Sequence, residues 1–333
     1  MHTQRIYIPL ADKEINADFM DIYDPYVFHG TTEFLKSSLR SNGPRSCRFC
    51  KKFGPEVKFK KDAHIIPNLL GNRHYLWNEE CDSCNELFGK FETHLSTFLG
   101  MPRTFSDIKG GEKYPTFISQ DASVAAKRLN EDLIFIKRND PDKGFQFDDQ
   151  AGSVTIDISR KVFIPAYVYN SFLKIALSVL PACDVSDYSL AYKYLIDTEN
   201  YAGLQGPRLV RIAESNYSYD NPFAVLFKKK IKDPIYPIHA LCLYARNLMF
   251  QIAFPLHKEE ITIAPKKTIE LPAPYVDMTA TMEEPITIQR SLIDLHSTEK
   301  FKETAKLSFS FDKQVLQNLV GVKLPDDLAK HLL

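Results

Sequence analysis

Hydrophobic positions along the chain change their spacing, and each spacing predicts a different element. Across CNELFGKFETHLSTFLG, residues 84–100, apolar side chains recur every three or four positions, which predicts an amphipathic helix that ends at Gly100. The longest apolar stretch is VFIPAYVYNSFLKIALSVLP, residues 162–181. Its apolar positions surround most of a helix and are interrupted by Asn170 and Lys174, so we predict a buried core helix rather than a membrane span.

Shorter patterns predict the other elements. EVKFKKDAHIIP, residues 56–67, alternates and is rich in β-branched and aromatic residues, which predicts a hairpin or a pair of short strands. Turn residues punctuate residues 107–149 and predict a turn-rich connection or a small sheet. Two more helices are predicted, at 31–40 and 186–197. Extended segments or strands are predicted at 5–10, 207–215, 223–230, 238–256 (with a hairpin turn at ARN) and 287–295.

We therefore predict an α+β protein whose chain divides into four parts. Residues 1–44 form a lead-in, residues 45–105 a cysteine-bearing domain, residues 106–149 a connecting segment, and residues 150–333 a C-terminal α+β domain.

Composition narrows the class of protein. With 333 residues, 44% of them apolar and 25% charged, the chain can bury one large core or two smaller ones. No apolar run reaches the about 18 residues that a membrane helix needs, and the first residues lack the pattern of a secretory signal. We therefore expect a cytoplasmic protein. Six cysteines are few for a disulfide scaffold of this length, and a reducing compartment keeps thiols free to bind metal.

Four cysteines form two C-x-x-C pairs, Cys47 with Cys50 and Cys81 with Cys84. Each pair suits a zinc knuckle, and the residues between them can fold back so that four thiolates hold one tetrahedral Zn²⁺. Four thiolates leave no open position, so the metal is structural. Redox exchange is the alternative, but two pairs within one basic block favour metal. Cys183 and Cys242 sit in apolar company and are expected to be small buried hydrophobes.

Local charge differs from the net charge, which is zero. A neutral chain gives no long-range attraction for nucleic acid. The segment RSCRFCKKFGPEVKFKK, residues 45–61, nevertheless carries seven Lys and Arg residues against the single acid Glu56. Such a concentrated basic run is what phosphate contacts require, although a solvated surface without a partner is the alternative.

A larger pattern joins these features. C-x2-C, then a strand-like segment that ends in HIIP, then C-x2-C-N at the start of a helix resembles the HNH endonucleases and their ββα-metal finger, over residues 45–105. The resemblance implies that His64 is the general base, which takes a proton from the attacking water. It also implies one divalent ion, Mg²⁺ or a similar metal, at the scissile phosphate, with Asn85 as a ligand.

The chain departs from the family pattern at the residue before His64. Many members have an acidic metal ligand there, whereas this chain has Ala63. Asp62 points to the opposite face of an unbulged strand. Glu92 lies seven residues after Asn85, hence on nearly the same helix face two turns along, and we prefer it as the second ligand.

The family also has an asparagine in the loop, which braces the histidine by hydrogen bonds to the backbone. This loop offers Asn68, Asn72 and Asn78. We choose Asn78 for its spacing from His64, because Asn72 follows Gly71 in what looks like a turn, where asparagine is common for local reasons.

The resemblance as a whole implies a phosphodiester hydrolase that cuts DNA, with RNA as an alternative substrate. It implies that residues 150–333 regulate or target the nuclease, that an activator can act on them, that the enzyme can form a homodimer, and that it can serve in anti-phage defence. Two other hypotheses stay open. One is a non-catalytic zinc module that binds nucleic acid, which Ala63 favours, and the other is an adaptor in which zinc stabilises a protein-binding face.

Overall fold

The computed structural model describes residues 19–30, 45–73, 75–110, 113–130, 134–140, 145–148, 150–200, 208–215, 217–254, 256–261 and 288–310. The elements predicted at residues 5–10 and 31–40 lie outside these ranges. Helices and strands are both abundant in the described part, so the α+β prediction is confirmed. No helix among the described residues combines the length and the apolar character needed to cross a membrane.

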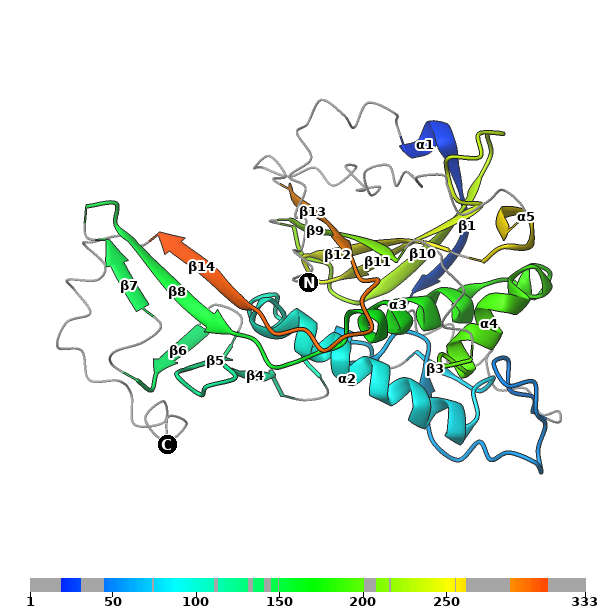
Figure 1. Cartoon of the computed structure of the whole chain (residues 1–333), viewed down its shortest axis with the longest axis horizontal. Helices are drawn as coiled ribbons and strands as arrows, with labels where there is room; N and C mark the ends of the chain where they lie inside the picture. Colours follow the sequence, from blue (N-terminus) through cyan, green and yellow to red (C-terminus); the bar gives the residue numbers. More distant parts are fainter. Residues whose placement is uncertain are drawn as a thin grey trace.

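The largest element is an antiparallel sheet of six strands (Figure 1). Its strands, in spatial order, are β1 (Tyr23–Gly30), β10 (Phe223–Lys229), β11 (His239–Ala245), β12 (Leu248–Ala253), β9 (Leu209–Ser215) and β13 (Ile288–Asp294). Every residue of β11 and β12 is buried, since both faces of the sheet are covered. Arg246 adopts a φ of 57° between these two strands, so the hairpin predicted at ARN is confirmed.

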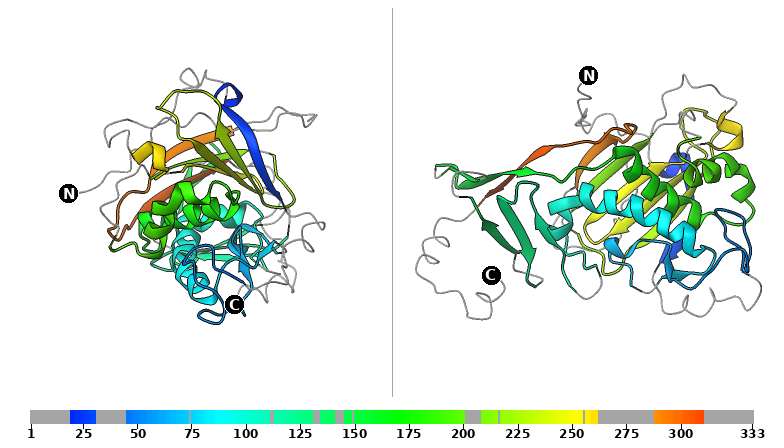
Figure 2. Two further views of the ribbon diagram at one scale, coloured as in Figure 1. Left: turned by 90° about the vertical axis from the view of Figure 1, so that its right-hand side faces the viewer. Right: turned by 60° about the horizontal axis from the view of Figure 1, so that its bottom comes forward.

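Helices cover the two faces of this sheet. One face carries α3 (Pro165–Val179), the 3-10 helix η3 (Val185–Tyr188) and α4 (Ser189–Ile196), while α1 (Phe19–Ile22) packs on the other. Figure 2 shows, in its left view, the sheet, then α3, then helix α2 (Asp82–Phe105) as successive layers. Helix α3 is therefore buried on nearly all sides, as its apolar pattern predicts.

The cysteine-bearing segment folds as a small finger against α3. It contains β2 (Ala63–His64), the 3-10 helix η2 (Asn68–Leu70), β3 (Leu76–Trp77) and α2. In α2, Gly100 leaves the helical conformation (φ 50°, ψ −128°), as predicted, and a further turn follows it to Phe105.

The strands predicted over residues 56–67 are much shorter than expected. Only Ala63 and His64 pair with a partner strand. Upstream of them, the amide groups of Lys60 and Lys61 donate to Oδ1 of Asp82, at 2.8 and 2.9 Å. The backbone of this stretch therefore binds the start of α2 instead of a neighbouring strand.

A β arm extends from the main body, to the left in Figure 1. One of its sheets holds β4 (Thr116–Ile118), β5 (Val124–Arg128) and β6 (Ile134–Arg138), and the other holds β7 (Phe145–Asp148), β8 (Ser153–Ser159) and β14 (Thr304–Ser310). They share a separate apolar core that includes Phe117 and Ile156. The small sheet predicted within residues 107–149 is confirmed. The remaining described helix, α5 (Lys258–Ile261), lies between β12 and β13 in sequence.

The main apolar core crosses the predicted domain boundaries. Phe88 of the finger, Phe172 of α3 and Phe250 of the sheet all belong to one buried cluster. The division of the chain into four parts stays a prediction, but its second and fourth parts do not have separate cores.

Candidate active site and zinc centre

The four paired cysteines meet at the base of the finger. Their Sγ atoms all lie within 4.8 Å of one another. Cys47 Sγ is 3.7 Å from Cys84 Sγ, and Cys50 Sγ is 3.8 Å from Cys81 Sγ. Zinc–sulfur bonds of about 2.3 Å in a tetrahedron place sulfur atoms about 3.8 Å apart, so the cluster has the dimensions of a zinc site. With four sulfur donors and no open position, such a site is structural.

The pKa of one thiol of this cluster, that of Cys47, is low enough to favour the thiolate. The hydrogen bond between Cys47 and Cys84, together with backbone amides including that of Cys50, lowers the pKa of Cys47 to about 4, against the opposing effect of burial. The same bond raises the pKa of Cys84. Thiolates are the form that binds zinc, and a bound metal displaces the remaining thiol protons.

The other two cysteines differ from each other. Cys242 is 1% exposed in β11, which confirms the prediction for it. The prediction for Cys183 is wrong, because its side chain is exposed. Helix α3 ends at Val179 and the chain turns at the surface, where the sulfur of Cys183 lies 3.7 Å from the Tyr26 hydroxyl.

His64 occupies the second position of β2, opposite Leu76. Its side chain is half-buried. Burial lowers the pKa of His64, the nearby charge of Lys174 lowers it further, and Asp62 opposes both. The imidazole is therefore neutral at neutral pH, which is the form that can accept a proton from water.

The loop between the two short strands closes around Asn72. Its Nδ2 donates to the carbonyl oxygens of Ile66 (2.6 Å) and Tyr75 (3.1 Å), and its Oδ1 accepts from the Tyr75 amide (2.8 Å). The side chain is fully buried. These are the backbone bonds that we predicted for Asn78, so that assignment is corrected to Asn72.

The correction has a physical reason. Asn78 follows β3, and its Nδ2 is buried without a hydrogen-bond partner among the described residues. Gly71, at a φ of 92°, ends η2 and turns the chain so that Asn72 points inward. The Gly-Asn pair in the sequence was the available signal, and we read it only as a local turn.

Asn85 and Glu92 both lie on α2 with half-buried side chains. Burial raises the pKa of Glu92, while Lys174 lowers it and Glu80 raises it. An amide oxygen and a carboxylate are donors that Mg²⁺ accepts, with water completing its shell. Within the described residues the four cysteines are the only cluster of three or more His, Cys, Asp or Glu donors able to share one ion. Asn85 and Glu92 as metal ligands stay predictions.

Two residues near His64 were missed in the sequence. Lys174 of α3 donates to the main-chain carbonyl oxygen of His64, and its Nζ lies 3.0 Å from Oε2 of Glu80. The side chains of Lys174 and Glu80 are 2% and 0% exposed. Burial raises the pKa of Glu80, and Lys174 opposes this. The signal was a lysine inside an apolar helix, from which we concluded only that the helix does not cross a membrane.

One of three comparisons with known proteins found a match. Residues 47–97 match the family model described as HNH endonuclease. Residues 47–97 are therefore similar to an HNH endonuclease domain, and we call them the HNH domain. The match includes both cysteine pairs, His64, Asn72 and the first part of α2. Neither the search of curated proteins nor the search of solved structures found a match to the chain.

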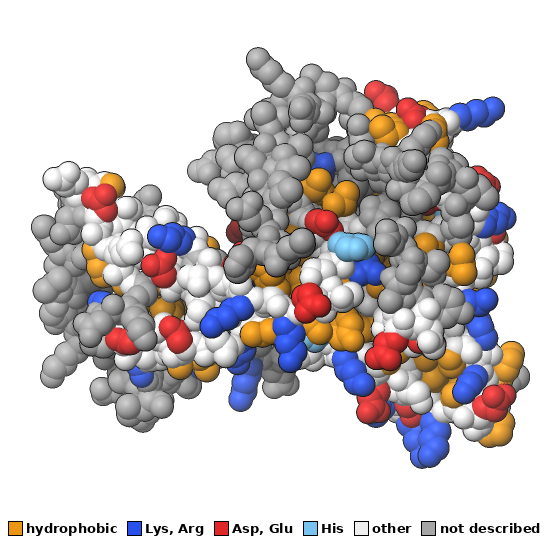
Figure 3. Space-filling model, viewed as in Figure 1, with side chains coloured by type: hydrophobic (Ala, Val, Ile, Leu, Met, Phe, Trp, Pro, Cys, Tyr) orange, Lys and Arg blue, Asp and Glu red, His pale blue; other side chains and the backbone are white. Residues whose placement is uncertain are grey.

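Basic side chains lie on an exposed loop of the HNH domain. Lys58, Lys60 and Lys61 are exposed on the loop before β2, and among the described residues only Lys61 of the three has an acidic neighbour, Glu86 at 3.9 Å. Figure 3 shows Lys and Arg side chains along the lower edge of the molecule in that view, with acidic ones between them. We call Lys58, Lys60 and Lys61 the basic face.

Proposed function

We propose that the protein is a metal-dependent endonuclease that hydrolyses phosphodiester bonds in DNA. The observation that carries this proposal is the environment of His64, a half-buried imidazole with a lowered pKa inside the matched HNH segment. The basic face on the loop before β2 supports a phosphate-bearing substrate.

In the proposed mechanism, His64 accepts the proton of the water that attacks the scissile phosphate. Asn72 fixes the loop that carries the imidazole, because it bonds both ends of that loop. Asn85 and Glu92 are the proposed donors to a divalent ion such as Mg²⁺, which supplies charge neutralisation at the phosphate when bound. Zinc at the four cysteines holds the finger together and takes no part in the reaction.

The roles of the C-terminal half are part of the same proposal. Helix α3 and the six-stranded sheet share a core with the HNH domain, which supports a regulatory or targeting role for residues 150–333. An activator of that half, a homodimer that cuts both strands and a place in anti-phage defence rest on the family resemblance, whereas a cytoplasmic location rests on the composition.

A second candidate function is a zinc module that binds nucleic acid without cutting it. Ala63 favours it, because this residue stands where many HNH enzymes carry an acidic metal ligand and is 1% exposed. Asp62, one position earlier, is exposed on the surface.

The two functions are separated by incubating purified protein with plasmid DNA and Mg²⁺ or Mn²⁺. We expect the wild type to cut, and His64→Ala to cut at least about 100-fold more slowly while it still binds DNA. His296→Ala, which alters an exposed histidine, is the matched control and should cut like the wild type. DNA binding without cleavage in the wild type would support the second function, and equal cleavage by His64→Ala would refute the role of His64.

A further inference from the structure

Lys174 is the one charged residue of helix α3, whose other buried side chains are mostly apolar. Its side chain is 2% exposed, and a buried ammonium group is costly unless it is paired and hydrogen-bonded. Glu80 supplies the charge partner, at 3.0 Å. Since Glu80 directly precedes the zinc cysteine Cys81, this ion pair joins the C-terminal half to the second cysteine pair.

The second contact of Lys174 is with the catalytic strand. Its ammonium group donates to the main-chain carbonyl oxygen of His64. Strand β2 has only two residues and pairs only with β3, so few ladder bonds of its own fix its position. An additional donor at His64 itself therefore has a large share in setting where the imidazole points.

The position of Lys174 is set from the opposite side of α3. The Tyr169 hydroxyl donates to the carbonyl oxygen of Ala253 at 3.0 Å, and the ring of Phe172 packs against that of Phe250 with centroids 5.1 Å apart. Both partners lie in β12. Helix α3 is thus anchored to the sheet on one side, and on the other side it presents Lys174 to the HNH domain.

We propose that Lys174 is a positioning residue for His64, so that the C-terminal half completes the active site of the HNH domain. This inference rests on the proposed nuclease function. The competing explanation is that Lys174 only neutralises the buried carboxylate of Glu80. The two explanations differ in which contact matters, the one to the His64 carbonyl or the one to Glu80.

The test compares Glu80→Gln with the double variant Lys174→Met/Glu80→Gln in the full chain. Both lack the ion pair, but only Glu80→Gln keeps the donor to His64. We expect Glu80→Gln to retain kcat within about threefold, and the double variant to lose at least about tenfold in kcat with KM for DNA nearly unchanged. Lys193→Met, which alters an exposed lysine of α4, should leave kcat unchanged.

Hydrogen exchange gives a readout that does not depend on cleavage. In the double variant the amides of β2 and β3 should exchange faster than in Glu80→Gln, while the zinc content of the two variants is equal. Lys174→Arg, which keeps a cationic donor, covers the case in which the double variant does not fold, and should stay within about tenfold of wild-type kcat.

Equal kcat and equal exchange in Glu80→Gln and the double variant would overturn the inference, as would a loss in Glu80→Gln as large as in the double variant. A Lys174→Arg variant as slow as His64→Ala would also overturn it. A wild type that binds DNA without cutting it would instead refute the proposed function, and the exchange experiment would still decide whether Lys174 holds the strand.

Discussion

Arg48 donates a 2.6 Å hydrogen bond from Nη1 to the carbonyl oxygen of Leu180, the C-cap residue of helix α3. Its Nε donates to Glu79 at 2.7 Å, and the guanidinium lies 5.0 Å from the centroid of the Trp77 ring. Arg48 stands between Cys47 and Cys50, so the first zinc knuckle caps the end of the helix that carries Lys174. Arg48 therefore links the first cysteine pair to the C-terminal half.

Replacement of Arg48 tests this link. Arg48→Ala leaves the Leu180 carbonyl without its cationic partner, and we expect the free energy of unfolding to fall by about 2 kcal/mol. Denaturant unfolding measures it. Lys52→Ala, an exposed position in the same knuckle, is the matched control and should change it by less than about 0.5 kcal/mol. Equal effects of the two variants would contradict the link.

The two loop asparagines give a second prediction. Asn72→Ala leaves three buried backbone groups without partners, and we expect a loss of about 3 kcal/mol in unfolding free energy together with a large loss of cleavage. Asn78→Ala removes no hydrogen bond of Nδ2 that the described residues provide, so it should cost less than about 1 kcal/mol. Thermal or denaturant unfolding and plasmid cleavage compare them. The reverse order would restore the assignment to Asn78.

Sequence patterns located the finger but did not identify which asparagine, or which distant lysine, contacts its backbone. The cysteine spacing and the HIIP and CN signatures located the finger, because a metal site demands particular residues at particular distances. The partner of Lys174 at His64 is 110 residues away in sequence, and a lysine in an apolar helix does not identify its partner. Helices α2, α3 and α4 and strands β9 to β13 followed from the sequence pattern, whereas β1, β8 and β14 were not predicted. The short strands β2 and β3 depended on where backbone hydrogen bonds form, which only the folded chain decides.

The zinc centre gives a third prediction. Protein that has not met a chelator should contain about one zinc per chain, since four sulfur donors complete a tetrahedral site. Cys47→Ser should lower that content and the thermal unfolding midpoint, because the finger then loses the metal that holds it. Cys183→Ser, an exposed cysteine outside the cluster, should change neither. Metal analysis measures the zinc content and thermal unfolding measures the midpoint. Wild-type protein without zinc would refute the zinc site.

The basic face gives a fourth prediction. If Lys58, Lys60 and Lys61 bind phosphates, replacing all three by Gln should weaken DNA binding at every sequence. It should also reduce the slope of log affinity against log salt by about 0.9 for each phosphate that is no longer neutralised. Fluorescence anisotropy over a salt series measures both, and zinc content should not change. The matched control replaces three exposed lysines elsewhere, Lys300, Lys302 and Lys306. Identical salt slopes for the two triple variants would show that the basic face does not bind DNA.

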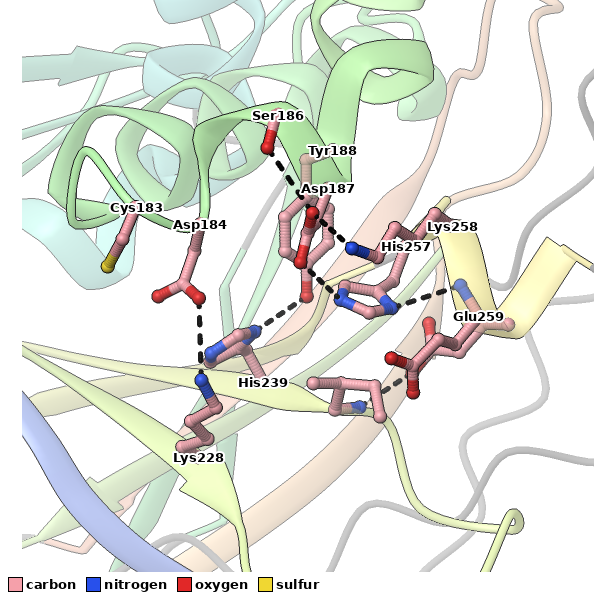
Figure 4. Close-up of polar contacts among 12 residues, drawn as sticks. Cys183, Asp184, Ser186, Asp187, Tyr188, Lys228, His239, His257, Lys258 and Glu259 are labelled. Atoms are coloured by element: carbon pink, nitrogen blue, oxygen red, sulfur yellow. Dashed lines mark hydrogen bonds and ion pairs between the residues drawn. The ribbon is translucent and has the colours of Figure 1, made fainter.

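A buried polar cluster beside the six-stranded sheet gives the last prediction. Figure 4 shows His239 below Tyr188, whose hydroxyl lies 2.8 Å from Nδ1 of His239. Burial lowers the pKa of His239 to about 4 from its ordinary 6.5. Burial raises the pKa of Glu260 from its ordinary 4.5 to about 7, although its carboxylate accepts the Ile238 amide at 2.6 Å.

These shifts make stability depend on pH in opposite directions. For His239 the unfolded chain binds more protons between about pH 4 and 6.5, so its contribution to stability is complete above about pH 6.5 and is lost as the pH falls. For Glu260 the folded chain binds more protons between about pH 4.5 and 7, so its contribution is complete below about pH 4.5 and is lost as the pH rises. Between about pH 4.5 and 6.5 the pH dependences of the two contributions are opposite and cancel in the wild type.

Variants that remove one of the two groups should therefore reveal the pH dependence of stability that the other group causes. Glu260→Gln keeps an acceptor for the Ile238 amide and leaves His239 unopposed, so its unfolding free energy should rise with pH relative to the wild type, by up to about 1.4 kcal/mol per pH unit. His239→Gln keeps a partner for Tyr188 and should show the opposite relative slope. Denaturant unfolding between pH 4.5 and 6.5 measures both. Parallel curves of unfolding free energy against pH for the wild type and the two variants would show that neither group has a different pKa in the folded and the unfolded chain.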